Sequence, residues 1–270
     1  MRAVTVALAQ TAPALGDNEE NLRRMAVIIA RICGEQQVDL IAFPELAVSG
    51  YECGLHFTRL AERVGGHAAT FLAGKAAEFG VHLVFGMPVK EKVESILFNA
   101  AIVIGPDGEI LGDYRKLHLR GEERMAFRPG YRMPVFETAI GNIGVMLGWD
   151  LAFPEVARSL VLDGAELLVV CASWEAARAA EWQAFTMARA CENEAFVVAV
   201  NRVGIEPSYV FGGGSVLVGP RGTVHTKLDG DAEGYALATV DLDEIRHVRE
   251  ESQLLQCRQP TAYRALARKY

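Results

Sequence analysis

The sequence ELLVVCA, residues 166–172, is apolar at every position after its first residue. A strand of this composition is typical of a parallel sheet that is covered on both faces. Residues 140–147 form a second apolar run upstream, and residues 153–163 between the two runs predict a helix that ends at Gly164. Strand, helix and strand in this order indicate an α/β fold with helices outside the sheets.

The same alternation continues through the rest of the chain. Helices are predicted over residues 18–34, 67–79, 181–194 and 241–250, and strands over 4–9, 38–43, 81–87, 99–104, 195–201, 213–218, 222–226 and 235–240. The turn sequences GPDG at 105–108 and GPRG at 219–222 predict two hairpins. No linker interrupts the pattern, so residues 1–250 are predicted to form a single domain. Residues 251–270 are predicted to be a C-terminal tail that docks on a partner subunit.

Composition and charge narrow the class of protein. The 270-residue chain is 51% hydrophobic and 23% charged, with a formal net charge of −7. It can bury enough apolar surface to fold, and its acidic balance argues against a nucleic-acid partner. No stretch reaches the roughly 18 apolar residues that a membrane span needs. The five cysteines are scattered and odd in number, so we expect no disulfide framework and a cytoplasmic location.

Three segments place polar residues directly after apolar strands, where ligands gather in open α/β sheets. They read FPELAVSGY at 43–51, YRKLHL at 114–119 and GVMLGWDLAFPE at 144–155. Taken alone, each has an ordinary explanation, because a carboxylate at a strand end usually caps or pairs and a lysine is usually a solvated charge. Their joint presence in this order is a much more specific signal.

These three segments resemble the signature motifs of the nitrilase superfamily, the carbon–nitrogen hydrolases. Further matches lie at Phe98-Asn99, FRPG at 127–130, ACEN at 190–193 and NRVG at 201–204. The resemblance implies a four-layer α-β-β-α sandwich that assembles as a homodimer or larger homo-oligomer. It also implies chemistry that needs no cofactor and no metal, and no two histidines of this chain have the spacing of metal ligands.

The resemblance further implies a Glu–Lys–Cys mechanism. Glu45 matches the general base that takes the thiol proton and later activates water, and Lys116 matches the cation that stabilises the oxyanion. Glu123 matches a second glutamate of the site, and Glu122 is the alternative candidate for that position. A thiol needs an adjacent base to become a nucleophile, and a lysine between two carboxylates keeps its charge.

The third member of the triad departs from the family pattern. The position of the nucleophilic cysteine is occupied by Gly148, which has no side chain, so this chain is expected to form no thioester. We favour an engineered, substrate-trapping replacement, because every other motif is intact and glycine tolerates a strand-to-helix elbow. The alternatives are a natural pseudoenzyme that only binds and replacement of the thiol by another cysteine, for which Cys171 is the candidate.

The substrate class follows from the same resemblance. The aspartate of the pair Trp149-Asp150 favours a small-molecule amide over a nitrile as the substrate. The alternatives are a nitrilase, an N-carbamoyl amino-acid hydrolase or an ω-amide hydrolase. The last two would use arginines to bind a carboxylate; the candidates are Arg120, Arg124, Arg128 and Arg178. The residues expected to wall the substrate pocket are Tyr51, Trp149, Cys171 and Trp174.

Overall fold

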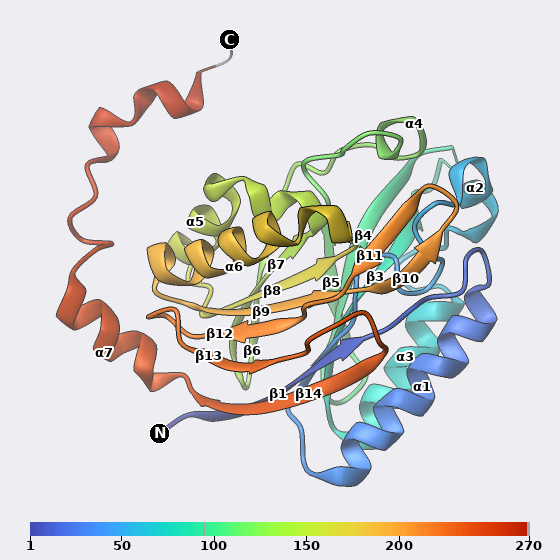
Figure 1. Cartoon of the computed structure of the whole chain (residues 1–270), viewed down its shortest axis with the longest axis horizontal. Helices are drawn as coiled ribbons and strands as arrows, with labels where there is room; N and C mark the ends of the chain where they lie inside the picture. The colour runs from blue at the N-terminus through green and yellow to red at the C-terminus, as the bar shows by residue number, and fades with distance from the viewer. Residues whose placement is uncertain (94, 269–270) are drawn as a thin grey trace.

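The computed structural model describes residues 1–93 and 95–268, which form two stacked six-stranded sheets with helices on both outer faces (Figure 1). Sheet A holds, in spatial order, β14 (Gly234–Asp241), β1 (Ala3–Gln10), β2 (Leu40–Ala42), β3 (His82–Lys90), β4 (Leu97–Ile104) and β5 (Ile110–Arg115). Sheet B holds β13 (Val224–Lys227), β12 (Val216–Val218), β9 (Phe196–Asn201), β8 (Leu167–Ala172), β7 (Gly141–Leu147) and β6 (Val135–Thr138). The predicted four-layer α-β-β-α sandwich is therefore confirmed.

The central strands of each sheet are parallel, and the outer strands pair antiparallel to them. In sheet A, β1, β2 and β3 run parallel; in sheet B, β7, β8 and β9 do. A separate hairpin, β10 (Val203–Glu206) with β11 (Tyr209–Gly212), follows β9. Because parallel strands present their carboxyl ends at one edge, polar residues after β2, β7 and β8 can meet there.

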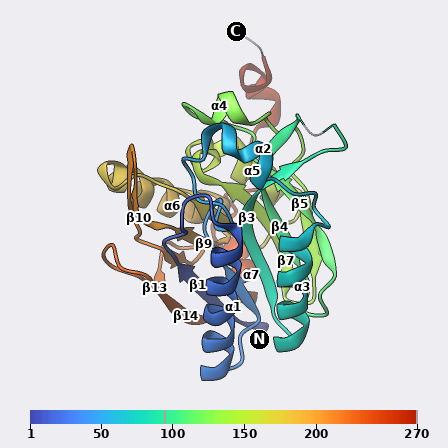
Figure 2. The ribbon, with the colours of Figure 1, turned by 90° about the vertical axis from the view of Figure 1, so that its right-hand side faces the viewer.

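Four helices complete the layers. The helices α1 (Asn18–Glu35) and α3 (His67–Phe79) lie side by side on sheet A, as Figure 2 shows, and α5 (Pro154–Leu162) and α6 (Ala179–Asn193) cover sheet B. The other α-helices of the described residues are α2 (Phe57–Leu60), α4 (Glu123–Ala126) and α7 (Asp243–Ser252), with 3-10 turns at Gly54–His56, Gly148–Ala152, Ala176–Arg178, Pro260–Ala262 and Arg264–Ala267.

The central strands are apolar at nearly every position because they contribute to three apolar cores. One core lies between the two sheets, and the other two lie between a sheet and its helices. Val169 on β8 packs between the sheets, whereas the next residue, Val170, packs beneath α5 and α6. On β3, Val84 faces the space between the sheets and Leu83 faces α1 and α3. Alternate side chains of a strand point to opposite faces, so a strand buried on both faces must be apolar throughout.

Most predicted elements lie where the sequence places them. The helix over 67–79 is α3, and Gly80 ends it with φ 65° in the left-handed region. Both predicted hairpins form, as β4 with β5 and β12 with β13. The predicted strand over 213–218 is shorter, because two glycines with positive φ precede Val216.

The C-terminal tail leaves α7 on the side of α5 and α6 and runs clear of the two sheets (Figure 1). Its exposed apolar side chains include Leu254, Tyr263 and Leu266. Residues 269–270 of this tail lie outside the described residues, and its docking on a partner subunit stays a prediction. No helix within the described ranges is long and apolar enough to cross a membrane.

Candidate active site

Four strand ends bring the functional residues together. Glu45 follows β2 and Lys116 follows β5 in sheet A, whereas Gly148 follows β7 and Ser173 follows β8 in sheet B. Glu45, Lys116 and Gly148 are buried. The three motifs that lie far apart in the sequence therefore form one site at the carboxyl ends of β2, β5 and β7.

A buried ion-pair network occupies this site. Lys116 Nζ lies 2.7 Å from Glu45 Oε1 and 2.5 Å from Glu123 Oε1. Glu122, the rival for the second glutamate, is exposed. Burial lowers the pKa of Lys116, but Glu123 and Glu45 together raise it above its usual value, so the ammonium stays charged. Burial raises the pKa of Glu45, and the positive charge of Lys116 opposes that rise.

Two further groups hold the Glu45 carboxylate. Asn99 Nδ2 donates to Oε1 at 2.7 Å, and the backbone nitrogen of Ser173 donates to Oε2 at 2.9 Å. Sequence reasoning assigned no role to either residue. Asn99 carried a signal, since it belongs to a motif and is a buried polar residue in a strand. Ser173 carried none, because a backbone donor is independent of residue type.

Gly148 lies directly against the network. Its φ of 44° is in the left-handed region, and a Cβ built on it would lie 2.5 Å from Glu45 Oε2 and 3.0 Å from Lys116 Nζ. A side chain at this position would therefore point at the base and at the ammonium group. It would also require the end of the flexible Glu45 side chain to move aside.

Asp150 connects the elbow after β7 with the loop that carries Lys116. It is fully buried, and its Oδ2 accepts a hydrogen bond from Tyr114 Oη at 2.7 Å. Its Oδ1 accepts from the His118 backbone nitrogen at 2.8 Å and lies 2.8 Å from His118 Nδ1. Since Lys116 lies between Tyr114 and His118, this carboxylate fixes the distance from Lys116 to position 148.

Tyr51 and Trp149 flank the network. Tyr51 is half-buried and packs edge-to-face on Tyr209, with ring centroids 5.2 Å apart. Burial, and then the charges of Glu123 and Glu45, raise the pKa of Tyr51 above its usual value, so its hydroxyl stays protonated. Trp149 is half-buried and packs edge-to-face on Phe153.

Trp174 and Cys171 have mainly structural surroundings. Trp174 is 5% exposed and packs against Trp182 in the core beneath α6. Cys171 is fully buried in the core between the sheets, where burial raises the pKa of its thiol. An apolar environment of this kind keeps a thiol protonated and inert.

The charged groups of the site pair with one another, Lys116 with both Glu45 and Glu123. Within the described ranges, no three His, Cys, Asp or Glu side chains gather in a way that could hold a metal ion. The cation of the site is the Lys116 ammonium. The arrangement offers a buried base, a hydrogen-bond donor for a developing oxyanion, and a backbone position between them.

Comparison with known proteins gives a consistent result. A family model for carbon–nitrogen hydrolases matches residues 5–250. A probable nitrilase of Schizosaccharomyces pombe is 41% identical over 265 residues, covering 97% of each chain. A 2-oxoglutaramate amidase of Bacillus subtilis is 31% identical over 248 residues, covering 91% of this chain and 94% of that protein.

A solved structure with the same fold is an amidase from Nesterenkonia sp. AN1, in a mutant form with the acetamide moiety of fluoroacetamide added covalently at its active-site cysteine. It superposes with a TM-score of 0.86 at 28% identity, covering 97% of this chain and 96% of that one.

Proposed function

The chain belongs to the carbon–nitrogen hydrolase family, and we propose that its site is built to hydrolyse a small amide to a carboxylic acid and ammonia. The amidases among its relatives support this substrate class. We further propose that position 148 is the place of the nucleophile, so that this chain, with Gly148, binds an amide without turning it over. The observation that carries the proposal is the direction of a Cβ at 148, toward Glu45 and Lys116.

With cysteine at position 148, the site supports two consecutive steps. Glu45 takes the thiol proton, sulfur attacks the amide carbon, and Lys116 donates to the oxyanion as the carbonyl becomes tetrahedral. The C–N bond then breaks, and the nitrogen takes the proton from Glu45 and leaves as ammonia. Glu45 next removes a proton from water, whose oxygen displaces the thiolate and releases the acid, and Glu45 then returns that proton to the thiolate.

Replacing Gly148 by cysteine tests the proposal. We expect the Gly148→Cys variant to release ammonia from small amides and to gain the mass of an acyl group in intact-protein mass spectrometry. Gly148→Ala is the matched control, because it adds the same Cβ without the sulfur and should remain inert. A folded Gly148→Cys variant that releases no ammonia from amides, nitriles or carbamoyl compounds would overturn the proposal.

The role of Glu45 needs its own test in the restored enzyme. We expect Glu45→Gln combined with Gly148→Cys to lose turnover, because a neutral amide cannot take the thiol proton. Retained ammonia release in the double variant would show that another group acts as the base.

A second candidate substrate is an amide that also carries a carboxylate. The Arg120 guanidinium lies 5.9 Å from the Trp149 ring centroid and pairs with Glu175 at 3.0 Å. A substrate carboxylate could replace Glu175 on Arg120, and the relative from B. subtilis acts on 2-oxoglutaramate. In the Gly148→Cys background, Arg120→Gln should then raise KM for carboxylate-bearing amides and leave KM for neutral amides unchanged.

A further inference from the structure

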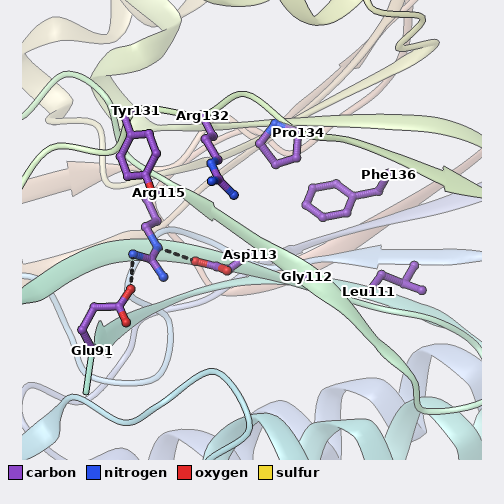
Figure 3. Close-up of a pocket in the computed structure, with 9 residues that line it drawn as sticks. All are labelled: Glu91, Leu111, Gly112, Asp113, Arg115, Tyr131, Arg132, Pro134 and Phe136. Carbon is purple, nitrogen blue, oxygen red and sulfur yellow. Dashed lines mark hydrogen bonds and ion pairs between the residues drawn. The ribbon is translucent and has the colours of Figure 1, made fainter.

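A cavity of about 430 Å³ lies along the free edges of the two sheets (Figure 3). Its walls are β5, the edge strand of sheet A, and the segment that leads into β6, the edge strand of sheet B. It shares no lining residue with the Glu45–Lys116–Glu123 network. Its volume lies within the range of small-molecule pockets, roughly 300–1,000 Å³.

The apolar end of the cavity depends on a glycine in the edge strand. Gly112 has φ 152°, and a Cβ there would lie 2.9 Å from a ring carbon of Phe136. The Phe136 ring can therefore lie close to the backbone of β5, beside Leu111 and Pro134. These three side chains form an apolar surface that extends to the charged end of the cavity.

The charged end has carboxylates on one wall. Arg115 Nε donates to Asp113 Oδ2 at 2.7 Å, and Arg115 Nη1 donates to Glu91 Oε1 at 2.5 Å. Two of the three Arg115 nitrogens are thus engaged, and its guanidinium lies 4.3 Å from the Phe98 ring centroid. The second oxygen of each carboxylate accepts no hydrogen bond from a side chain of the described residues. This wall has an excess of one negative charge.

The opposite wall carries the balancing positive charge. Arg132 makes no ion pair or hydrogen bond with any residue in the ranges 1–93 and 95–268, and its guanidinium lies 5.2 Å from the Tyr131 ring centroid. Figure 3 shows the Arg132 side chain projecting from its segment toward β5, where Asp113 and Arg115 lie. The cavity therefore offers the Arg132 guanidinium on one wall and the carboxylates of Asp113 and Glu91 on the other.

We propose that this cavity binds a small zwitterion with an apolar side chain, of the class of the α-amino acids. The ligand carboxylate pairs with Arg132, its ammonium group pairs with Asp113 and Glu91, and its side chain lies on Leu111 and Phe136. A simple anion would meet the excess negative charge of the β5 wall, and a simple cation would meet Arg132. Only a ligand with both charges satisfies both walls.

Isothermal titration calorimetry with L-phenylalanine tests the assignment on the chain as it stands. We expect a dissociation constant in about the millimolar range or tighter, weakened about tenfold or more by Arg132→Gln and by Asp113→Asn. Two matched ligands, 3-phenylpropionate without the ammonium group and phenethylamine without the carboxylate, should each bind at least about tenfold more weakly. Arg246→Gln, an exposed arginine on α7, should leave the affinity unchanged.

Each other outcome overturns the proposal. If no binding is detected at about 10 mM L-phenylalanine, the cavity has no amino-acid site with a dissociation constant in the millimolar range or tighter. Equal binding of 3-phenylpropionate identifies an anion site instead, and equal affinity of the Arg132→Gln variant, folded by circular dichroism, places the ligand elsewhere. Glu45→Gln separates this cavity from the catalytic site, because loss of L-phenylalanine binding in that variant would assign the ligand to the buried network.

Discussion

The two sheets contribute to the site in different ways. Sheet A supplies charge, since Glu45 and Lys116 follow its strands and meet as buried ions 2.7 Å apart. Sheet B contributes backbone groups, since Gly148 has no side chain and the Ser173 backbone nitrogen donates a hydrogen bond to Glu45. The charges are therefore held by groups other than the residue at position 148.

This difference explains how the charged network persists with glycine at position 148. Buried charges are costly unless each has a partner, and Lys116 has Glu45 on one side and Glu123 on the other. Glycine at position 148 leaves no charge without a partner, because a thiol at that position would be neutral before it reacts. Substitutions on the sheet A side should accordingly be more harmful to stability than substitutions on the sheet B side.

Removal of the central cation is the most severe way to test this contrast. Lys116→Met leaves two carboxylates buried together, so we expect a loss of about 3–5 kcal/mol in the free energy of unfolding, measured by urea denaturation. Lys75→Met is the matched control. Lys75 pairs with Glu78 on the surface at 2.7 Å, and its loss should cost less than about 1 kcal/mol. Equal losses in the two variants would contradict the contrast.

Asp150 links the two sheets at the site, because it follows β7 of sheet B and accepts hydrogen bonds from the segment that carries Lys116. Asp150→Asn replaces an acceptor oxygen by a donor beside Tyr114 and His118, and we expect it to cost about 2–3 kcal/mol in urea denaturation. Asp229→Asn, at an exposed aspartate paired with Lys227, should cost far less. A small effect at Asp150 would mean that the loop of Lys116 keeps its position without this carboxylate.

Position 148 should give a smaller effect, because only the end of the Glu45 side chain must move. Gly148→Ala places a Cβ on backbone with φ 44°, and we expect a loss of about 1–2 kcal/mol. Gly34→Ala, near the end of α1 with no atom within 4 Å of the new Cβ, should be neutral or stabilising. A stabilised Gly148→Ala variant would show that the elbow does not require glycine.

The smallest expected effect is on the pH dependence of stability, and it concerns His82, a buried histidine of sheet A. Burial lowers the pKa of His82, although its contact with the Asp39 carbonyl opposes this. As pH falls below about 6.5, the unfolded chain takes up a proton before the folded chain does, so stability declines until the lower folded pKa is passed. His82→Gln should lose less stability between pH 7.5 and 5.5; identical slopes would refute the assignment.

Local signals in the sequence predict most of the fold. The helix α3 could be placed because its apolar residues have helical spacing and Gly80 supplies a left-handed cap. The strand β6 and the hairpin of β10 with β11 were missed, because Val135–Thr138 and Val203–Gly212 lack a strong alternation or a tight-turn sequence. Each of these strands pairs with its neighbour in the sequence, β6 with β7 and β10 with β11, and residue propensity alone does not encode that pairing.

The site could be predicted where side chains carry the chemistry and not where backbone or burial does. Glu45, Lys116 and Glu123 were placed by their motifs, and the structure brings all three together. The amide of Ser173 leaves no trace in residue type, and Cys171 was expected in the pocket but lies in the core between the sheets. Depth within a layered fold is a property of packing, which spacing along one strand does not reveal.

The left-handed glycine at the elbow also has a genetic consequence. Gly148 adopts a backbone conformation that a cysteine can share at a modest cost, and the base and the ammonium group are already in place around it. The glycine codons GGT and GGC differ from the cysteine codons TGT and TGC only in the first base. Where GGT or GGC encodes this glycine, the site lies a single nucleotide change from a thiol, and selection for amide hydrolysis in a growing population could introduce it in one mutational step.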